Sequence, residues 1–256
     1  MGAHCRGVAS NVSVLLQVIK PSIATNQGAS TGQVNTNKFT MPHIHNIILD
    51  FDGTIADTQS LIVKTLQDTM VAHNLPILPT QQCAKVIGLR LDECFATLFP
   101  TLSHDDALSC ADSYRHIFDD NKFLIPVQPF PNVIPTIVHL HEHGHKLALA
   151  SSRSRASLIN YIDTFHIANC IDAIVAADDV KQAKPHPEMA IKALTLLNAL
   201  PTDAIVVGDM PYDILMGKAA GATTCAVTYG NATPDQLSMA DHIIPDFQLL
   251  IPIVEQ

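Results

Sequence analysis

The feature that most constrains the fold is a short apolar run that ends in two carboxylates. Residues 46–58 read Asn-Ile-Ile-Leu-Asp-Phe-Asp-Gly-Thr-Ile-Ala-Asp-Thr. An apolar run bounded by turn residues is typical of a buried parallel strand. Residues two apart on a strand project to the same side, so Asp50 and Asp52 can point toward one site. In an open α/β sheet that site lies at the carboxyl ends of the strands.

Two carboxylates at such an edge suit a hard divalent cation. They also suit a division of labour in which one carboxylate attacks and the other moves protons. The alternative interpretation is a strand followed by an ordinary Asp-Gly turn. Matching polar residues at the ends of later strands would favour the first interpretation.

The rest of the chain alternates apolar strands with helical patterns. Between the predicted strands, apolar residues recur at helical spacing. This alternation predicts an α/β fold with a doubly wound, mostly parallel, Rossmann-like sheet and helices on both faces. Apolar runs predict four further strands, at 146–150, 171–177, 204–207 and 224–228.

A block of about 65 residues after the first strand has a different character. Helical patterns begin after Thr58 and continue through 80–87, 91–99 and 105–118, without a convincing strand. A proline-rich connection at 126–131 then leads back to the alternating pattern. The block therefore predicts an inserted helical unit.

Composition excludes several function classes. The formal net charge of −9 gives no electrostatic support to nucleic-acid binding. No apolar run approaches the length that spans a bilayer, so we expect no membrane partner. The six cysteines are scattered without a CxxC pair, which favours reduced thiols and a cytoplasmic location.

Residues 1–41 differ from the remainder, because the first 40 residues contain no acidic residue and are rich in small polar ones. We interpret them as a disordered extension or as a start-site artefact with Met41 as the true start. An organellar presequence is the alternative, although the single arginine, Arg6, is weak support for it.

Polar residues do follow the later predicted strands. Ser151 follows one strand, Lys184 lies in the loop after the next, and Asp209 and Asp213 follow another. Taken singly, Ser151 is a plausible helix cap, Lys184 a solvated lysine, and the two aspartates ordinary residues of a helix start. Their occurrence at successive strand ends favours one shared site.

Four motifs together resemble the haloacid-dehalogenase-like hydrolase superfamily. The resemblance extends over residues 42–256 and is closest to proteins of the phosphoglycolate-phosphatase type. It implies an α/β core at 42–59 and 128–256 and an α-helical cap domain at 60–127. The motifs are DFDGTIADT at 50–58, LALASSR at 147–153, AKPHPEMA at 183–190 and VVGDMPYDILMGKAAGA at 206–222.

The resemblance implies a role for each carboxylate. Asp50 is the expected nucleophile, which forms an aspartyl-phosphate, and Asp52 is the expected general acid/base. Mg²⁺ is expected between Asp50, the backbone carbonyl of Asp52 and Asp209. Asp213 is expected to act through a bound water or to orient one. The dehalogenase branch of the superfamily lacks a carboxylate at the position of Asp52, so its presence implies phosphate chemistry.

Other residues are implied to contact substrate. Arg90, in the predicted cap, is placed where relatives contact the leaving group, and a surface arginine is the alternative. The side chains expected to bind the phosphate are Thr54, Ser151, Ser152 and Lys184.

The expected activity is a Mg²⁺-dependent phosphatase acting on a small phosphomonoester such as phosphoglycolate or a sugar phosphate. One alternative is a phosphomutase of the same superfamily, and another is a non-catalytic partner-binding protein on the same fold. The expected partner is a small phosphorylated metabolite, and the sequence does not indicate an oligomeric state. Four histidines at 139, 141, 143 and 145 are interpreted as a solvated helix end rather than a metal site.

Overall fold

The computed structural model describes residues 44–256, which belong to one compact unit. The extension predicted at 1–41 lies outside the described residues. At the centre of the unit is a sheet of six parallel strands in the order β5-β4-β1-β6-β7-β8. The strands are β1 (Asn46–Leu49), β4 (Lys146–Ala150), β5 (Ala173–Val175), β6 (Ala204–Gly208), β7 (Thr223–Val227) and β8 (His242–Ile244).

Strand β1 lies among the central strands of the sheet, and its residues 47–49 are apolar and buried on both faces. Leu49 is in register with Leu149 of β4 and Val207 of β6. Leu49 faces one core cluster and Ile48 faces another, and neither residue is exposed. The strand order reverses on either side of β1, which confirms the predicted doubly wound sheet.

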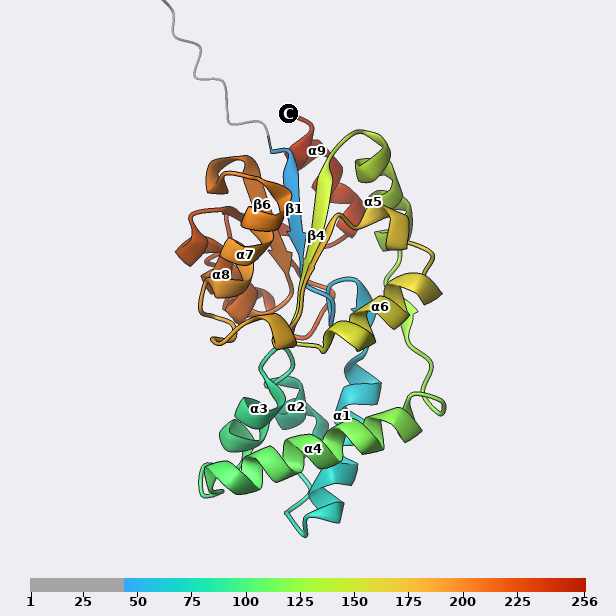
Figure 1. The fold of residues 1–256 in the computed structure, drawn as a ribbon, viewed down its shortest axis with the longest axis vertical. Helices are drawn as coiled ribbons and strands as arrows, with labels where there is room; N and C mark the ends of the chain where they lie inside the picture. The colour runs from blue at the N-terminus through green and yellow to red at the C-terminus, as the bar shows by residue number, and fades with distance from the viewer. Residues whose placement is uncertain (1–43) are drawn as a thin grey trace, which may run out of the picture. The chain divides into compact units, whose positions relative to one another are not determined.

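Helices cover both faces of the sheet (Figure 1). Apolar residues of α5 (Val133–Glu142), α6 (Arg155–Thr164) and α9 (Ile251–Val254) complete one core cluster. On the other face, α7 (Glu188–Leu197) and α8 (Pro211–Ala220) complete the second. Each helix thereby buries one apolar stripe against the sheet.

The four helices between β1 and α5 form the helical insert, residues 59–121, beyond the carboxyl edge of the sheet (Figure 1). Its apolar side chains form a core of their own, separate from the two clusters against the sheet. Because the insert and the sheet belong to one compact unit, their division into a core and a cap domain stays a prediction. The helices are α1 (Gln59–Ala72), α2 (Thr80–Ala84), α3 (Leu91–Leu98) and α4 (His104–Asn121).

Two connecting segments join the insert to the rest of the chain, and they lie side by side. The outgoing β2 (Ala56–Asp57) pairs with the returning β3 (Gln128–Pro129) in antiparallel fashion. Strands of two residues carry too little pattern to be predicted from sequence. The proline connection predicted at 126–131 therefore contains a short strand.

The structure also departs from the predicted elements at several ends. Strand β8 was not predicted, and β5 is shorter than the predicted run of 171–177. Helix α8 begins at Pro211, and Asp213 in its first turn accepts a hydrogen bond from the backbone N–H of Met210 at 3.1 Å. Among the described residues, no helix is long and apolar enough to cross a membrane.

Candidate active site

The loops after β1 and β6 approach each other closely enough that glycine is required. Gly53 has a φ of +82°, and a Cβ atom there would collide with the carboxylate of Asp209. Gly230, after β7, would collide with the same carboxylate. The glycine that follows Asp52 in the sequence therefore allows the first and fourth motifs to meet.

Lys184 connects two of the carboxylates predicted from the strand ends. Its ammonium donates to Asp50 Oδ1 at 2.6 Å and to Asp213 Oδ1 at 2.7 Å. The lysine side chain has no exposed surface. Burial disfavours the ammonium, but the charges of Asp213 and Asp50 outweigh it and raise the pKa of Lys184. Lys184 is therefore a buried cation and not the solvated loop lysine of the alternative interpretation.

Asp209 is held from two sides. Its Oδ2 accepts hydrogen bonds from the backbone and side-chain nitrogens of Asn231, at 2.7 and 2.8 Å. Thr54 Oγ1 donates to Asp209 Oδ1 at 3.4 Å. The sequence predictions missed Asn231, although its position just after the fifth predicted strand places it at the same edge of the sheet.

The buried carboxylates carry an excess of negative charge. Oxygens of Asp50, Asp209 and Asp213 lie within 4.8 Å of one another. Burial, opposed by Lys184, raises the pKa of Asp50 to about 7. Burial, together with Asp213 and Asp50, raises the pKa of Asp209 well above the usual carboxyl range.

Three carboxylates and one ammonium leave two negative charges, which a divalent cation would balance. All the donors in this cluster are carboxylate oxygens, the ligands that hard cations prefer. The residues present therefore fit a Mg²⁺ ion. Without a cation, burial and then repulsion among the carboxylates raise the pKa values of Asp50 and Asp209.

Asp52 has hydrogen-bond partners that do not belong to this cluster. It accepts from Thr58 Oγ1 at 2.6 Å. Arg153 Nε lies 2.8 and 2.9 Å from its two oxygens. Arg153 is the last residue of the second motif, and the sequence predictions gave it no role. Its position two residues after Ser151 is a signal that could have singled it out.

The remaining residues predicted to contact substrate, Ser151, Ser152 and Arg90, have different hydrogen-bond partners. The backbone N–H of Arg153 donates to Ser151 Oγ at 3.4 Å, and Ser151 is buried at the carboxyl end of β4. The hydroxyl of Ser152 points elsewhere and donates to the backbone oxygen of Gly88 in the insert, at 2.6 Å. Arg90 pairs with Asp92 through Nε at 3.1 Å and Nη2 at 2.9 Å.

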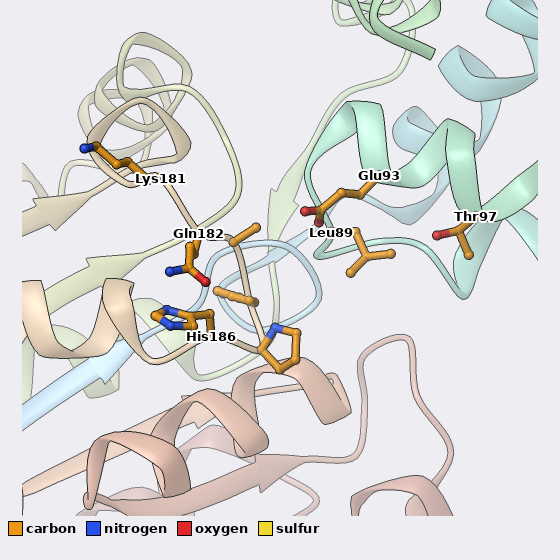
Figure 2. Close-up of a pocket in the computed structure, with 9 residues that line it drawn as sticks. Leu89, Glu93, Thr97, Lys181, Gln182 and His186 are labelled. Atoms are coloured by element: carbon orange, nitrogen blue, oxygen red, sulfur yellow. The ribbon is translucent and has the colours of Figure 1, made fainter. Parts of the chain in front are cut away.

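Two pockets of the described residues lie between the insert and the loops at the sheet edge. The Asp52-side pocket, of about 700 Å³, is lined by Asp52, Arg153, Arg90 and aromatic residues of α4 and α6. The Lys184-side pocket, of about 680 Å³, lies between the loop at 181–186 and the α3 region. In Figure 2, Gln182 and His186 lie on one side of it and Leu89 and Glu93 on the other.

Of the four histidines singled out in the sequence, His139 and His141 lie on α5 and His143 caps its end. His145 follows the helix and is buried, so the expectation of a solvated helix end is wrong for this residue. His139 Nε2 is 3.0 Å from Glu255 Oε1, and His143 Nδ1 is 2.8 Å from the backbone oxygen of His139. His139, His143 and Glu255 could hold a metal ion, but they are partly or fully exposed. This cluster is not part of the arrangement around Asp50.

Comparisons with known proteins agree with this geometry. A family model for haloacid dehalogenase-like hydrolases matches residues 47–227. The chain belongs to this family. Residues 47–227 contain all the site residues discussed above except Gly230, Asn231 and the exposed Glu255. The resemblance stated from the four motifs is therefore confirmed, and the protein is a hydrolase of this family.

Two relatives and two structures illustrate the similarity. The chain is 32% identical to the probable phosphatase IndB of Dickeya dadantii, over 76% of this chain and 86% of that protein. It is 31% identical to the pyrophosphatase PpaX of Halalkalibacterium halodurans, over 80% of this chain and 92% of that protein.

A haloacid dehalogenase-like hydrolase from Bacteroides fragilis superposes with a TM-score of 0.74 at 25% identity, covering 81% of this chain and 99% of that chain. A structure from Clostridium acetobutylicum superposes with a TM-score of 0.76 at 23% identity, covering 83% and 99%. At this lower identity, the similarity to the Clostridium acetobutylicum structure shows that the fold is shared and nothing more.

Proposed function

We propose that the protein is a Mg²⁺-dependent phosphatase that hydrolyses a small phosphomonoester through an aspartyl-phosphate. The observation that carries this proposal is the buried contact of Asp50 with Lys184, beside an acidic cluster whose charge a divalent cation would balance. A phosphate ester is an anion, and cationic groups are needed before a carboxylate can attack it.

Asp50 is the proposed nucleophile. Lys184 fixes one of its oxygens at 2.6 Å, and its other oxygen has no hydrogen bond among the described residues. The same ammonium would neutralise charge on the transferring phosphoryl group as a point charge. Bound Mg²⁺, held by Asp50, the backbone carbonyl of Asp52 and Asp209, would supply further charge neutralisation. Asp213 would act indirectly, by orienting Lys184.

Asp52 is the proposed general acid and base. It lies two residues from the nucleophile, and it lines the Asp52-side pocket, whereas it does not line the Lys184-side pocket. A group that protonates the leaving oxygen must face the leaving group. The leaving group is therefore placed in the Asp52-side pocket, where Arg90 would contact it. Ser151 and Thr54 are the hydroxyls proposed to surround the phosphate. Ser152 would join them only after its hydroxyl leaves the backbone oxygen of Gly88.

The relatives are named a probable phosphatase and a pyrophosphatase, so an organic phosphate and pyrophosphate are the two substrate classes to weigh. The Asp52-side pocket favours an organic leaving group. Its volume of about 700 Å³ exceeds what a phosphate needs, and much of its lining is apolar. Its cations Arg90, Arg115, Lys122 and Arg153 each form an ion pair with a carboxylate.

A panel of phosphate compounds tests the proposal. It should include phosphoglycolate, several sugar phosphates and pyrophosphate, each assayed with Mg²⁺ and with chelator. We expect phosphate release from at least one organic phosphomonoester, only with the metal. Isomer formation without phosphate release would instead show the phosphomutase alternative. No turnover by the folded protein on any compound would favour a non-catalytic protein that binds a partner.

A further inference from the structure

Arg153 makes an unusually complete set of contacts for an arginine next to an active site. Its Nε and Nη2 both reach the carboxylate of Asp52, at 2.8 to 2.9 Å. Its Nη1 donates to Ser157 Oγ at 3.0 Å. The side chain is only 9% exposed. The guanidinium is thus directed at Asp52 with little freedom to turn elsewhere.

Aromatic rings surround the same guanidinium. Its Cζ atom lies 5.6 Å from the ring centre of Phe51 and 5.1 Å from those of Tyr161 and Phe118. These distances are within the range of cation–π attraction, which is stronger for a desolvated cation. Phe51 lies in the loop after β1 and Tyr161 in α6, whereas Phe118 belongs to α4 of the helical insert.

Arg153 therefore joins three parts of the molecule. It is itself in the loop after β4, and its backbone oxygen accepts from the N–H of Ala177 at 2.9 Å, which fixes that loop. Its head group orients Asp52, and Phe118 of the insert covers the head group. Among the described residues, Arg153 is the one cation that pairs with Asp52.

We propose that Arg153 is the positioning residue of the acid/base carboxylate and that its stacking on Phe118 makes the position of Asp52 depend on the helical insert. This inference rests on the proposed phosphatase function. A two-pronged contact fixes the plane of a carboxylate as well as its place, which a single lysine contact cannot do. The insert then influences proton transfer to the leaving group as well as the choice of substrate.

Two esters of similar shape separate this role from substrate binding. Phenyl phosphate has a poor leaving group that needs a proton, whereas the leaving group of 4-nitrophenyl phosphate departs readily without one. The value of kcat/KM reports steps up to departure of the leaving group, so it excludes the later hydrolysis of the aspartyl-phosphate. We expect Arg153→Gln to lower kcat/KM for phenyl phosphate by roughly 10²-fold, as expected for a lost general acid. For 4-nitrophenyl phosphate we expect a loss of less than about tenfold, because little acid catalysis is lost.

Further variants test the two contacts separately. Arg153→Lys keeps the charge but not the two-pronged geometry, so it should recover part of the difference between the esters. Phe118→Leu should shift the ratio of the two kcat/KM values in the same direction, by a smaller factor. In an Asp52→Asn background, Arg153→Gln should no longer change this ratio, because the carboxylate that it positions is absent.

Arg155→Gln is the matched control. Arg155 lies two residues away and also pairs with a carboxylate, that of Asp179 at 2.6 Å, but it makes no contact with Asp52. It should leave the ratio unchanged. Thermal melting of each variant would confirm folding.

An equal loss for both esters in Arg153→Gln would overturn the inference, since that result indicates substrate binding or general damage. A ratio that still changes in the Asp52→Asn background would overturn it as well. Absence of metal-dependent turnover by the unmodified protein would contradict the phosphatase function itself.

Discussion

The ammonium of Lys184 lies 2.6 Å from Asp50 and 2.7 Å from Asp213, with no exposed surface of its own. Removal of one partner from a buried ion pair leaves an uncompensated charge and typically costs about 3–5 kcal/mol. We expect Lys184→Met to lose stability of this order and to be inactive. Urea unfolding in the presence of chelator measures the stability without interference from a bound metal.

The double variant Lys184→Met/Asp213→Asn checks that prediction. It removes the ammonium and one carboxylate together, so its loss of stability should be smaller than the sum of the two single losses. Additive losses would show that the two groups do not interact in solution.

The raised pKa of Asp209 predicts how the metal-free protein responds to pH. A carboxyl group whose pKa is higher in the folded chain holds its proton more tightly when folded. Asp209 therefore adds its full contribution to folding stability below about pH 4, the pKa of an unfolded aspartate. That contribution is lost as the pH rises through the pKa of Asp209 in the folded chain. In chelator, Asp209→Asn should melt at a higher temperature than the unmodified protein at pH 8, and the difference should shrink at pH 5.

Asp241 provides a control of opposite sign. Burial alone would raise the pKa of Asp241. Hydrogen bonds from Lys218 and Thr224, together with the positive charge of Lys218, outweigh burial and lower this pKa. Stability contributed by a lowered carboxyl pKa is present at neutral pH and is lost on acidification. Asp241→Asn should therefore lower the melting temperature more at pH 8 than near pH 2, well below the pKa of an unfolded aspartate. Equal effects of pH on both variants would contradict the placement of Asp209 among other carboxylates.

Gly53 and Gly144 form a matched pair, with φ values of +82° and +87°. An alanine at either position has to adopt the left-handed backbone region, which costs roughly 1–2 kcal/mol. Only at Gly53 would the new Cβ atom also collide with Asp209, whereas no atom lies within 4 Å at Gly144. We expect both variants to lose stability and only Gly53→Ala to lose Mg²⁺-dependent stabilisation, measured by melting with and without the metal. Equal Mg²⁺ effects in both variants would be inconsistent with Asp209 as a ligand.

Arg90 stays a prediction as a substrate contact. Its ion pair with Asp92 lines the Asp52-side pocket, so the guanidinium is near the proposed leaving group but already partnered. If it also contacts an anionic leaving group, Arg90→Ala should lower kcat/KM for such substrates by roughly ten- to a hundredfold. Arg115→Ala, in the same pocket but paired at the surface with Asp112, is the control. If Arg90→Ala leaves the ratios of kcat/KM among the substrates unchanged, Arg90 does not contact the leaving group and is a surface arginine.

The sequence predicted the sheet and the meeting of Asp50, Lys184 and Asp209 because parallel strands bring their carboxyl ends to one edge. Polar residues at successive strand ends thus carry three-dimensional information. Short elements escaped prediction, since two or three residues, as in β2 and β8, do not display a period.

Partners set by tertiary packing were also beyond the sequence. The position of Arg153 two residues after Ser151 places it near the carboxyl edge of the sheet. It does not reveal that the side chain reaches Asp52 or that Phe118, 35 positions earlier in the chain, covers it. Likewise, Asp92 follows Arg90 by only two residues, yet their pairing depends on how helix α3 begins. Such contacts depend on side-chain directions that only the folded chain defines.

The most direct test of the proposed chemistry is to trap a phosphoryl group on Asp50. Asp52→Asn should still be phosphorylated by 4-nitrophenyl phosphate, whose leaving group needs no acid, but should hydrolyse the aspartyl-phosphate slowly because the base is missing. Acid quenching and peptide mass spectrometry would then locate the phosphoryl group. We predict close to one phosphoryl group per chain, on Asp50, and none in the Asp50→Asn/Asp52→Asn double variant. A phosphoryl group on another residue, or sustained turnover by folded Asp50→Asn, would contradict the assignment of Asp50 as the nucleophile.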